Sequence, residues 1–407
     1  MAGLGAVVLA LVAAGVAVVV WSSHRAPRNA AAGVSSAPSP AGSPSLSRSP
    51  MVVTGPLPSG APVCGAKLAF IGSLTGPVGS LATSVRQGAQ LAINEYNQAH
   101  AGCTVTLVDF DTQGDTGRTT TVATAAAADQ QVVGVIGPLL SREVNGALPV
   151  LDRAGLTAIT ATATTPGLST NGWRVFHRAI PHDAEQGTAA ARYISRDLHA
   201  TKVFVVDNGS QYGATIAETV RSALGGAVAG TDRGHQGQTS FTTTVGRIKA
   251  SGATAVFYGG FADEAGALVT QLRAAGSTAT LVGGDGINES TFIAAAGQNA
   301  EGAVSTCACA PSTDPRFDSA FRTAYGVGPG DYSGTAYDVA NIFLVGLAHG
   351  VGTRADMLGF VNAFDGTGVS GGYRFTGTGE LDPARVSVAV FVVRGGRFTY
   401  DRAEPGQ

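Results

Sequence analysis

Charged residues are scarce in this chain: they make up 13% of its 407 positions, and the formal net charge is −2. Proteins that bind nucleic acid or an anionic membrane surface carry clusters of Lys and Arg, and the composition shows no such electrostatic footprint. We therefore expect no nucleic-acid partner and favour a neutral or zwitterionic small molecule. Hydrophobic residues make up 44% of the chain, which is enough for one or two cores.

The sequence also lacks the motifs of catalysis and of cofactor binding. The seven histidines form no H-x-x-x-H pair, and no G-x-S-x-G elbow, P-loop or G-x-G-x-x-G after a first strand occurs. Asp109, Asp111 and Asp115 lie close together, but their spacing does not match a calcium loop, and a structural role with Asp115 capping a helix is favoured. We expect no enzyme activity, no cofactor and no metal ion.

Cysteine is limited to four residues, and none precedes Cys64, so the chain shows no recognisable lipoprotein signal. Cys64 and Cys103 each stand just before a predicted strand, and a disulfide can join them if those strands are neighbours. Cys307 and Cys309, in STCACAP, would lie on one face of a strand, a poor geometry for a metal site without further ligands. Ordinary strand residues are the favoured interpretation of this pair, and a metal site is the alternative.

One long apolar run stands near the start of the chain. Residues 4–21 contain no charge and are just long enough to cross ~30 Å of hydrocarbon as a helix. Residues 1–25 form either a membrane anchor or an export signal, and the anchor is favoured because small-x-small cleavage sites, around residues 30–32, lie far from the run. Basic residues follow the run instead of preceding it, the reverse of the positive-inside pattern, which favours a natural product that begins upstream of Met1. Residues 26–63, rich in Ala, Pro, Ser and Gly, are expected to be a disordered linker.

From Lys67 onward, short apolar runs alternate with longer helical patterns. A first set contains KLAFIG, VTLVDFD, VVGVIG and LTAITATA, and a second set, from about Pro181, contains KVFVVD, AVAGTDR, TAVFYGG and TLVGGD. Strands that are apolar almost throughout are typical of a parallel sheet covered on both faces. Three helical stretches and a strand-rich ending follow Cys309, which indicates that the chain crosses back to complete both units. We predict an α/β fold with two open parallel-sheet lobes, an N-terminal lobe of residues 64–180 plus 310–367 and a C-terminal lobe of residues 181–309 plus 368–407.

Ligand sites of open α/β sheets form at the carboxyl ends of the strands, where the connecting loops face a crevice. Polar and aromatic residues follow several apolar runs here: Ser141, Thr162, Thr164, Phe261 and Asp285, while Tyr212 opens a helix. The start of the helix at Ser141 offers free N–H groups and a partial positive charge, which suit a carboxylate. The alternative is an ordinary N-cap serine, which contributes about 1 kcal/mol to stability. Further on, Asp183 is expected to cap a helix, with Gln186 completing a capping box.

Six motifs in order, GSLTGPVGS, GPLLS, ITATATTPGLS, DNGSQYGATIAE, VFYGGFADEAGALVTQLRAAG and GGDGI, resemble the periplasmic binding proteins for branched-chain amino acids. The similarity runs from about Lys67 to the C-terminus. It implies a type I periplasmic binding fold, in which two lobes joined by three crossovers close on a ligand. It also implies a role in transport, with an ABC permease in the membrane as the partner.

The resemblance assigns roles to individual residues. The ligand's carboxylate meets Ser141 and Thr164, and its ammonium meets the Thr162 carbonyl, the Thr164 hydroxyl and an acid that is here Asp285. An aspartate in place of the relatives' glutamate keeps the charge but is shorter by a methylene, so the ammonium must sit deeper or bind through water. Burial of an isobutyl side chain would contribute about 2 to 3 kcal/mol. The apolar contacts to that side chain fall on Leu81, Leu140, Tyr212 and Phe261.

Alternatives remain for several of these residues. Asp285 lies between glycines and suits a tight turn, and Tyr212 and Phe261 could serve only in packing. Arg142 and Glu143 replace the small hydroxylated residues of the relatives, and Gly114 and Leu140 replace a cysteine pair. Arg142 either binds a second ligand carboxylate or points to solvent, and the sequence favours solvent.

Taken with the apolar run, the resemblance predicts an extracytoplasmic solute-binding protein of an ABC-type amino acid uptake system, tethered to the cell membrane through residues 4–21. The alternative is a sensor ectodomain, in which the same closure signals through the N-terminal helix.

Overall fold

The computed structural model describes residues 51–76 and 78–405. The predicted membrane segment, residues 4–21, lies outside them, as does most of the predicted linker. Within the described ranges, no helix has both the length and the apolar character needed to span a bilayer.

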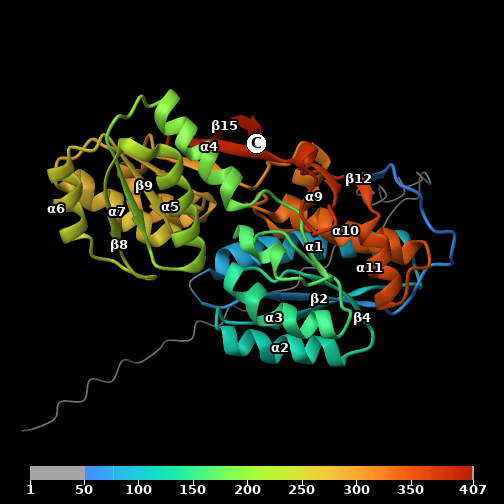
Figure 1. The fold of residues 1–407 in the computed structure, drawn as a ribbon. Helices are drawn as coiled ribbons and strands as arrows, with labels where there is room; N and C mark the ends of the chain where they lie inside the picture. The colour runs from blue at the N-terminus through green and yellow to red at the C-terminus, as the bar shows by residue number, and fades with distance from the viewer. Residues whose placement is uncertain (1–50, 77, 406–407) are drawn as a thin grey trace, which may run out of the picture. The chain divides into compact units, whose positions relative to one another are not determined.

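A five-stranded parallel sheet forms the centre of the first lobe (Figure 1). Its parallel register follows from the helices that separate successive strands, namely α1 (Gly79–Ala99), α2 (Thr116–Ala128) and α3 (Ser141–Arg153). As expected from its apolar run, the interior strand β2 (Lys67–Gly72) is buried at every position after its first. In spatial order the strands are β3 (Thr106–Asp111), β2, β4 (Val132–Ile136), β5 (Ala158–Thr160) and β6 (Phe176–Arg178).

The second lobe has a seven-stranded sheet in the order β15-β14-β11-β10-β9-β7-β8. Its five parallel strands are β7 (Val203–Asp207), β8 (Val228–Arg233), β9 (Ala255–Gly259), β10 (Thr280–Gly283) and β11 (Val304–Cys307). β14 (Ser387–Val393) and β15 (Phe398–Pro405) run antiparallel to their neighbours. The predicted parallel sheet is thus present, and the strand-rich ending adds an antiparallel hairpin, β14 and β15, at its edge.

Alternating residues of β9 explain why helices cover both faces of this sheet. Val256 and Tyr258 pack with α6 (Thr242–Ser251), α7 (Ala262–Ala274) and α8 (Ser290–Ala296). Ala255 and Phe257 point to the other face and pack with α4 (Asp183–Arg196) and α5 (Gln211–Leu224). An apolar residue is needed at every position of such a strand.

The chain passes between the lobes three times, between β6 and α4, between β11 and α9, and between β13 and β14. After the second of these crossings the chain is back in the first lobe, where it forms α9 (Pro315–Tyr325), α10 (Ser333–Ala348) and α11 (Arg354–Asn362). α10 is buried along nearly its whole length and lies beside α1 (Figure 1). The predicted lobe boundary after residue 367 falls between β12 (Asp365–Thr367) and β13 (Gly372–Arg374), which pair within one small sheet.

Residues 51–63 correct the prediction of a linker. β1 (Val52–Val53) pairs antiparallel with β12, and the backbone amide of Val63 donates a hydrogen bond of 2.9 Å to the carbonyl of Leu347. Met51, Val53 and Val63 also pack against the core of the first lobe. By comparison, residues 26–50 of the predicted linker are rich in Ala, Pro, Ser and Gly and contain few large apolar residues.

A disulfide joins Cys64 to Cys103 across a sequence separation of 39 residues, with the Cα atoms 4.5 Å apart. The two cysteines precede β2 and β3, which are neighbours in the sheet. The predicted disulfide required these two strands to be neighbours, so the prediction is confirmed. Closing a loop of this length stabilises the fold by about 4 kcal/mol in the chain-entropy account. The bond lies at the amino ends of the strands.

One predicted helix start is wrong by a residue. The N-cap of α4 is His182, whose ring accepts a hydrogen bond of 3.3 Å from the amide of Ala184, and Glu185 completes the capping box. Asp183 and Gln186, the residues expected in those roles, are instead fully buried. The other predicted cap is confirmed, since Asp115 accepts a hydrogen bond of 2.6 Å from the amide of Arg118.

Candidate functional site

A cavity with a volume of about 110 Å³ lies between the two lobes. Its walls come from the carboxyl ends of β4, β5, β9 and β10 and from the starts of α1, α3, α5 and α7. All eight residues that the sequence assigns to the ligand line it: Leu81, Leu140, Ser141, Thr162, Thr164, Tyr212, Phe261 and Asp285. The structure thus brings them together, and their contacts with a ligand remain a prediction.

Ser141 is the first residue of α3, and the N-cap position belongs to Leu140, so the interpretation of Ser141 as an N-cap is wrong. The hydroxyl of Ser141 accepts a hydrogen bond of 3.3 Å from the amide of Thr165, and the residue is 5% exposed. Glu143 takes the capping role, accepting a hydrogen bond of 2.9 Å from the amide of Leu140 and another from the hydroxyl of Thr112. Burial raises the pKa of Glu143 to about 7.

The loop after β5 holds Thr162 and Thr164 beside Ser141. The Thr162 hydroxyl donates a hydrogen bond of 2.5 Å to the carbonyl of Leu139, and the Thr160 hydroxyl donates one of 2.7 Å to the carbonyl of Pro138. These bonds tie the loop to the segment that leads into α3. Hydroxyls and helix amides therefore share one wall of the cavity, an arrangement that suits an anion.

Asp285 lies on the opposite lobe, directly after β10, and its carboxylate has a partner on each oxygen. Gln186 donates a hydrogen bond of 2.7 Å to one oxygen, and the hydroxyl of Tyr332 donates one of 2.5 Å to the other. Burial raises the pKa of Asp285, and both hydrogen bonds lower it. Sequence reasoning found neither partner, because Gln186 and Tyr332 lie 99 and 47 residues away along the chain.

Four carboxyl groups gather around this wall: Asp183, Asp285, Glu289 and Asp331. Burial raises the pKa of Asp183 to about 8, helped by the nearby charge of Asp285. Burial and then Asp285 and Asp263 raise the pKa of Glu289 to about 7, and burial raises that of Asp331 well above its usual value. Among the described residues, none of the four forms a salt bridge, so a cation that enters the cavity finds little competition from the protein.

Apolar side chains complete the cavity between these polar walls. The rings of Tyr212 and Phe261 lie 5.6 Å apart, and Leu81 and Leu140 also line the space. The hydroxyl of Tyr212 accepts a hydrogen bond of 3.0 Å from the amide of Gly286, which turns the polar end of the ring towards the backbone. The wall offered to a ligand is thus largely hydrocarbon.

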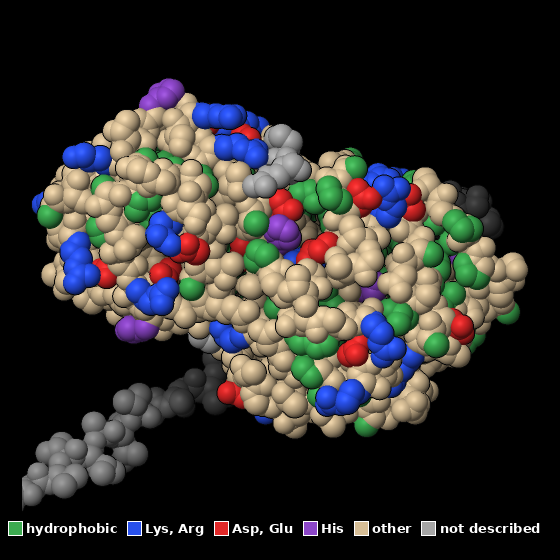
Figure 2. Space-filling view, in the orientation of Figure 1, with side chains coloured by type: hydrophobic (Ala, Val, Ile, Leu, Met, Phe, Trp, Pro, Cys, Tyr) green, Lys and Arg blue, Asp and Glu red, His purple; other side chains and the backbone are tan. Residues whose placement is uncertain are grey.

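Arg142 spans the cleft instead of pointing to solvent, contrary to the favoured prediction. Its guanidinium donates a hydrogen bond of 2.8 Å to the carbonyl of Gly114 in its own lobe and one of 3.2 Å to the side chain of Gln236 in the other. Asn145 likewise donates a hydrogen bond of 3.0 Å to Gln211 across the cleft. On the face shown in Figure 2, Lys and Arg side chains are scattered, several of them beside acids, in line with the low charge of the sequence.

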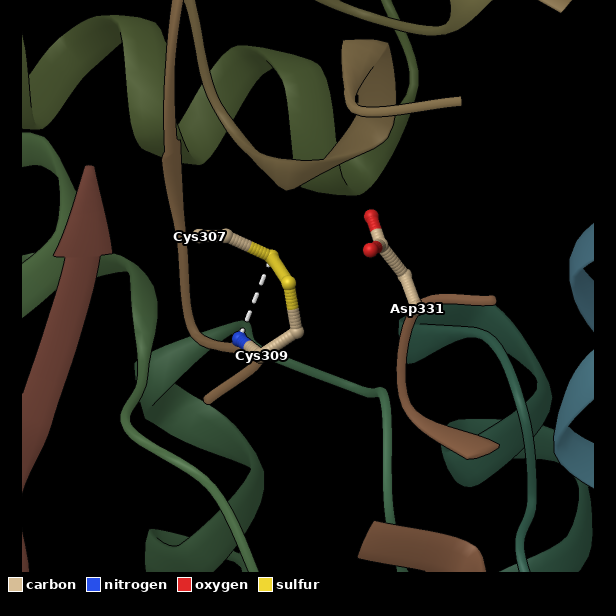
Figure 3. Close-up of side chains that lie close together, drawn as sticks. All are labelled: Cys307, Cys309 and Asp331. Carbon is tan, nitrogen blue, oxygen red and sulfur yellow. Dashed lines mark hydrogen bonds between the residues drawn. A yellow bond between two sulfur atoms is a disulfide. The ribbon is translucent and has the colours of Figure 1, made fainter. Parts of the chain in front are cut away.

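Cys307 and Cys309 are bonded to each other, so their interpretation as ordinary strand residues is wrong. Figure 3 shows Asp331 on a separate segment opposite the two sulfurs, and its carboxylate and both Sγ atoms lie within 4.8 Å of one another. The disulfide spans a sequence separation of only 2 residues. In the chain-entropy account it stabilises the fold by roughly 1.5 kcal/mol, less than half the contribution of the Cys64–Cys103 bond.

Comparison with known proteins places this site in context. Residues 65–394 match the family described as periplasmic binding protein. The leucine-, isoleucine-, valine-, threonine- and alanine-binding protein of Pseudomonas aeruginosa is 30% identical over 255 residues, which are 61% of this chain and 68% of that protein. The Leu/Ile/Val-binding protein of Escherichia coli is 31% identical over 245 residues, which are 59% of this chain and 66% of that protein. The chain thus spans about two thirds of the length of these relatives.

A solved structure extends the similarity over both lobes. The branched-chain amino acid transporter substrate-binding protein of Streptococcus pneumoniae, determined in complex with isoleucine, matches with a TM-score of 0.77 at 26% identity. The match covers 83% of this chain and 98% of that protein.

Proposed function

Since the chain belongs to the periplasmic binding protein family, of the leucine-, isoleucine- and valine-binding type, we propose that it captures a branched-chain or similar amino acid outside the cytoplasm and presents it to an ABC permease. Proteins of this family bind solutes for transport and are not enzymes. The observation that carries the proposal is the cavity itself, in which hydroxyls of one lobe face a carboxylate of the other across apolar side chains.

We assign the two charged groups of the amino acid to different lobes. Its carboxylate binds the hydroxyls of Ser141 and Thr164 and the first amides of α3. Its ammonium binds the carboxylate of Asp285, together with the Thr162 carbonyl and the Thr164 hydroxyl. A ligand held in this way contacts both lobes only when they are closed, so it binds the closed form better and shifts the population towards it.

The side chain of the amino acid is assigned to the apolar wall formed by Leu81, Leu140, Tyr212 and Phe261. An aliphatic group buried there contributes about 2 to 3 kcal/mol, which separates leucine from alanine by a factor of about 30 to 150. Asp285 is shorter than the glutamate of the relatives, and its two present partners hold it in the cavity wall. The ammonium therefore sits deeper or binds through a water molecule.

Isothermal titration calorimetry against a panel of amino acids tests the proposal. We expect leucine, isoleucine and valine to bind with one site per chain, alanine to bind more weakly, and glutamate and lysine to bind weakest. The variant Asp285→Asn keeps the shape of the site but removes its charge, and we expect it to weaken leucine binding about 100-fold. The absence of heat for every amino acid in the panel would contradict the proposal.

We propose further that residues 4–21 tether the protein to the membrane, because this uncharged run has neither a lipid-attachment cysteine nor a nearby cleavage site. The mass of the protein in washed membranes tests this. Retention of residues 1–25 in a membrane-bound form is expected, whereas a released protein beginning near residue 33 would show a cleaved signal instead.

The sensor ectodomain stays the alternative, supported by the same apolar run and by its flanking charges. The two roles differ in the membrane partner that recognises the closed form. Purification from membranes with leucine present is expected to recover permease subunits, and recovery of a kinase or other signalling protein would favour sensing.

A further inference from the structure

The Cys307–Cys309 disulfide occupies an unusual position, at the point where the chain leaves β11 to return to the first lobe. The disulfide closes a very short loop, so it constrains the unfolded chain little and contributes little to stability in that way. Both cysteines are buried, at 0% and 2% exposure, directly beneath the wall of the cavity that carries Asp285. A positioning role fits this location better than a stabilising one.

Three side chains form hydrogen bonds with Asp285, and two of them, Gln186 and Tyr332, contact this bridge, while the third is Tyr212. The amide of Ala308, between the two cysteines, donates a hydrogen bond of 3.1 Å to the side-chain oxygen of Gln186, whose nitrogen donates one of 2.7 Å to Asp285. The Sγ of Cys307 lies 3.9 Å from the hydroxyl of Tyr332, which donates a hydrogen bond of 2.5 Å to the other oxygen of Asp285. A change in the bridge is therefore transmitted to both oxygens.

A third contact reaches the same segment from the other cysteine. The side-chain amide of Asn288 lies 3.8 Å from the Sγ of Cys309 and donates a hydrogen bond of 2.7 Å to the carboxylate of Asp331. The backbone amide of Asn288 donates a hydrogen bond of 2.9 Å to the carbonyl of Asp285. Asn288 therefore connects the turn that contains Asp285 to the disulfide. Figure 3 shows Asp331 facing the bridge from a separate segment of the chain.

We propose that the Cys307–Cys309 disulfide is a redox-responsive positioning element for Asp285, and that opening it weakens the binding of the ligand's ammonium group. This inference rests on the proposed function, because it takes Asp285 as the acid that binds the ammonium. The disulfide acts through Gln186 and Tyr332 and does not itself contact the ligand.

A dithiol reductant opens the bridge in a two-electron reaction. One thiolate of the reductant attacks a sulfur of the bridge and forms a mixed disulfide. This first attack releases the other cysteine as a thiolate. The second thiol of the reductant then displaces the remaining cysteine, so the reductant becomes a cyclic disulfide and its two protons pass to the sulfurs of Cys307 and Cys309. Cys309 also lines a second hollow, shared with Pro311, Asp331 and Tyr332, through which a small reductant can approach.

The test uses the full chain in a C64S/C103S background, in which the bridge between Cys307 and Cys309 is the remaining disulfide. This background is a suitable reference because Cys64 is exposed and lies at the amino ends of the strands, away from the cavity. Leucine binding is measured by calorimetry from pH 4 to 9 for the oxidised protein, for the dithiol-reduced protein, and for C307S/C309S in the same background. A chelator is present throughout, so that freed thiols cannot capture a metal ion.

Loss of the bridge is expected to lower the leucine affinity about tenfold near pH 7 and to move the acid limb of binding to higher pH. The shift is expected because Asp285 loses well-placed donors that favour its charged form. The other ionisable groups around it, which are Asp183, Tyr212, Glu289, Asp331 and Tyr332, are the same in all three proteins. The two freed thiols occur in the reduced protein alone, and C307S/C309S is the control for their ionisation. A general loosening of the fold would instead lower the affinity by the same factor at every pH.

An affinity that is unchanged, or reduced equally at all pH values, would overturn the inference. A thermal scan of each sample shows whether it is folded. If C307S/C309S does not fold, the comparison of leucine affinity between the oxidised and the reduced protein tests the inference. Failure of the proposed function gives a different result, since the oxidised reference would then bind no amino acid of the panel.

Discussion

The hydroxyl of Tyr332 donates a hydrogen bond of 2.5 Å to the carboxylate of Asp285, across a sequence separation of 47 residues. This bond lowers the pKa of Asp285, while burial raises it. The ammonium of a ligand binds the charged carboxylate, so binding is lost as the pH falls through the pKa of this group. In Tyr332→Phe the bond is absent and the pKa rises, so we expect the acid limb of leucine binding to move to higher pH. Calorimetry from pH 4 to 8 measures it, and an unchanged limb would show that Tyr332 serves only in packing.

The hydroxyl of Thr164 is assigned to both charged groups of the ligand. Thr164→Val replaces it with a methyl group of similar size, and we expect the leucine affinity to fall about 10- to 100-fold, the effect of losing a hydrogen bond to a charged group. Thr164→Ser keeps the hydroxyl and is expected to bind within about threefold of the unmodified protein. Similar affinities for the two variants in calorimetry would remove Thr164 from the site.

Asp183 links stability to pH. Its pKa is about 8 in the folded protein against an ordinary value of 3.8, because it is buried. Between these values the folded protein holds a proton that the unfolded chain releases, so the contribution of Asp183 to stability is greatest at low pH and falls as the pH rises towards 8. Asp183→Asn removes this loss, and we expect it to be more stable at pH 8 by at least about 1 kcal/mol, with no gain at pH 4. Urea unfolding at both values checks the difference, and equal gains at the two values would contradict it.

The hydrogen bond between Arg142 and Gln236 joins the lobes at the rim of the cavity. Because it forms only when the lobes are close together, it should favour the closed form. We expect Arg142→Ala and Gln236→Ala each to weaken leucine binding about two- to tenfold, and the double variant to be no weaker than the poorer single variant. Calorimetry of the four proteins yields the coupling energy, and strictly additive losses would show that the two side chains act separately.

The Cys64–Cys103 disulfide should affect stability without affecting binding. Its removal in C64S/C103S is expected to lower the free energy of unfolding by about 2 to 4 kcal/mol, because the unfolded chain gains the freedom of the long loop. The leucine affinity should stay within about twofold, since the bond lies at the amino ends of the strands. Chemical unfolding and calorimetry measure the two quantities, and a large loss of affinity would mean that the bond also shapes the cavity.

Much of the fold could be predicted from the sequence, because strands buried on both faces must be apolar almost throughout and therefore stand out from the helices between them. β2, for example, coincides with the run KLAFIG. The antiparallel hairpin of β14 and β15 could not be predicted in this way, since an edge hairpin and a parallel strand have similar apolar patterns. The short strand β1 escaped prediction because its two residues gain stability only from their partner in β12.

The cavity lining was predictable because the carboxyl ends of parallel strands meet at one edge, so residues such as Thr162 and Asp285 could be located from the runs before them. Gln186, Tyr332 and the Cys307–Cys309 bond were not predictable, because each acts through contacts with residues distant in the sequence. Asp183 illustrates a further difficulty. It and His182 are both able to cap a helix, and the buried surroundings of Asp183, which include Thr164, Arg178 and Asp285, come partly from segments distant in the sequence.

The pairing of β1 with β12 has a mechanical consequence. Because residues 52 and 53 are fixed to the first lobe, any force transmitted along the chain from its N-terminal side acts on that lobe alone. The second lobe is joined to the first by the three crossing segments and by hydrogen bonds across the cleft, such as that between Arg142 and Gln236. With the tether and the closure proposed above, the second lobe is the half expected to swing as the molecule shuts, while the first stays stationary with respect to the tether.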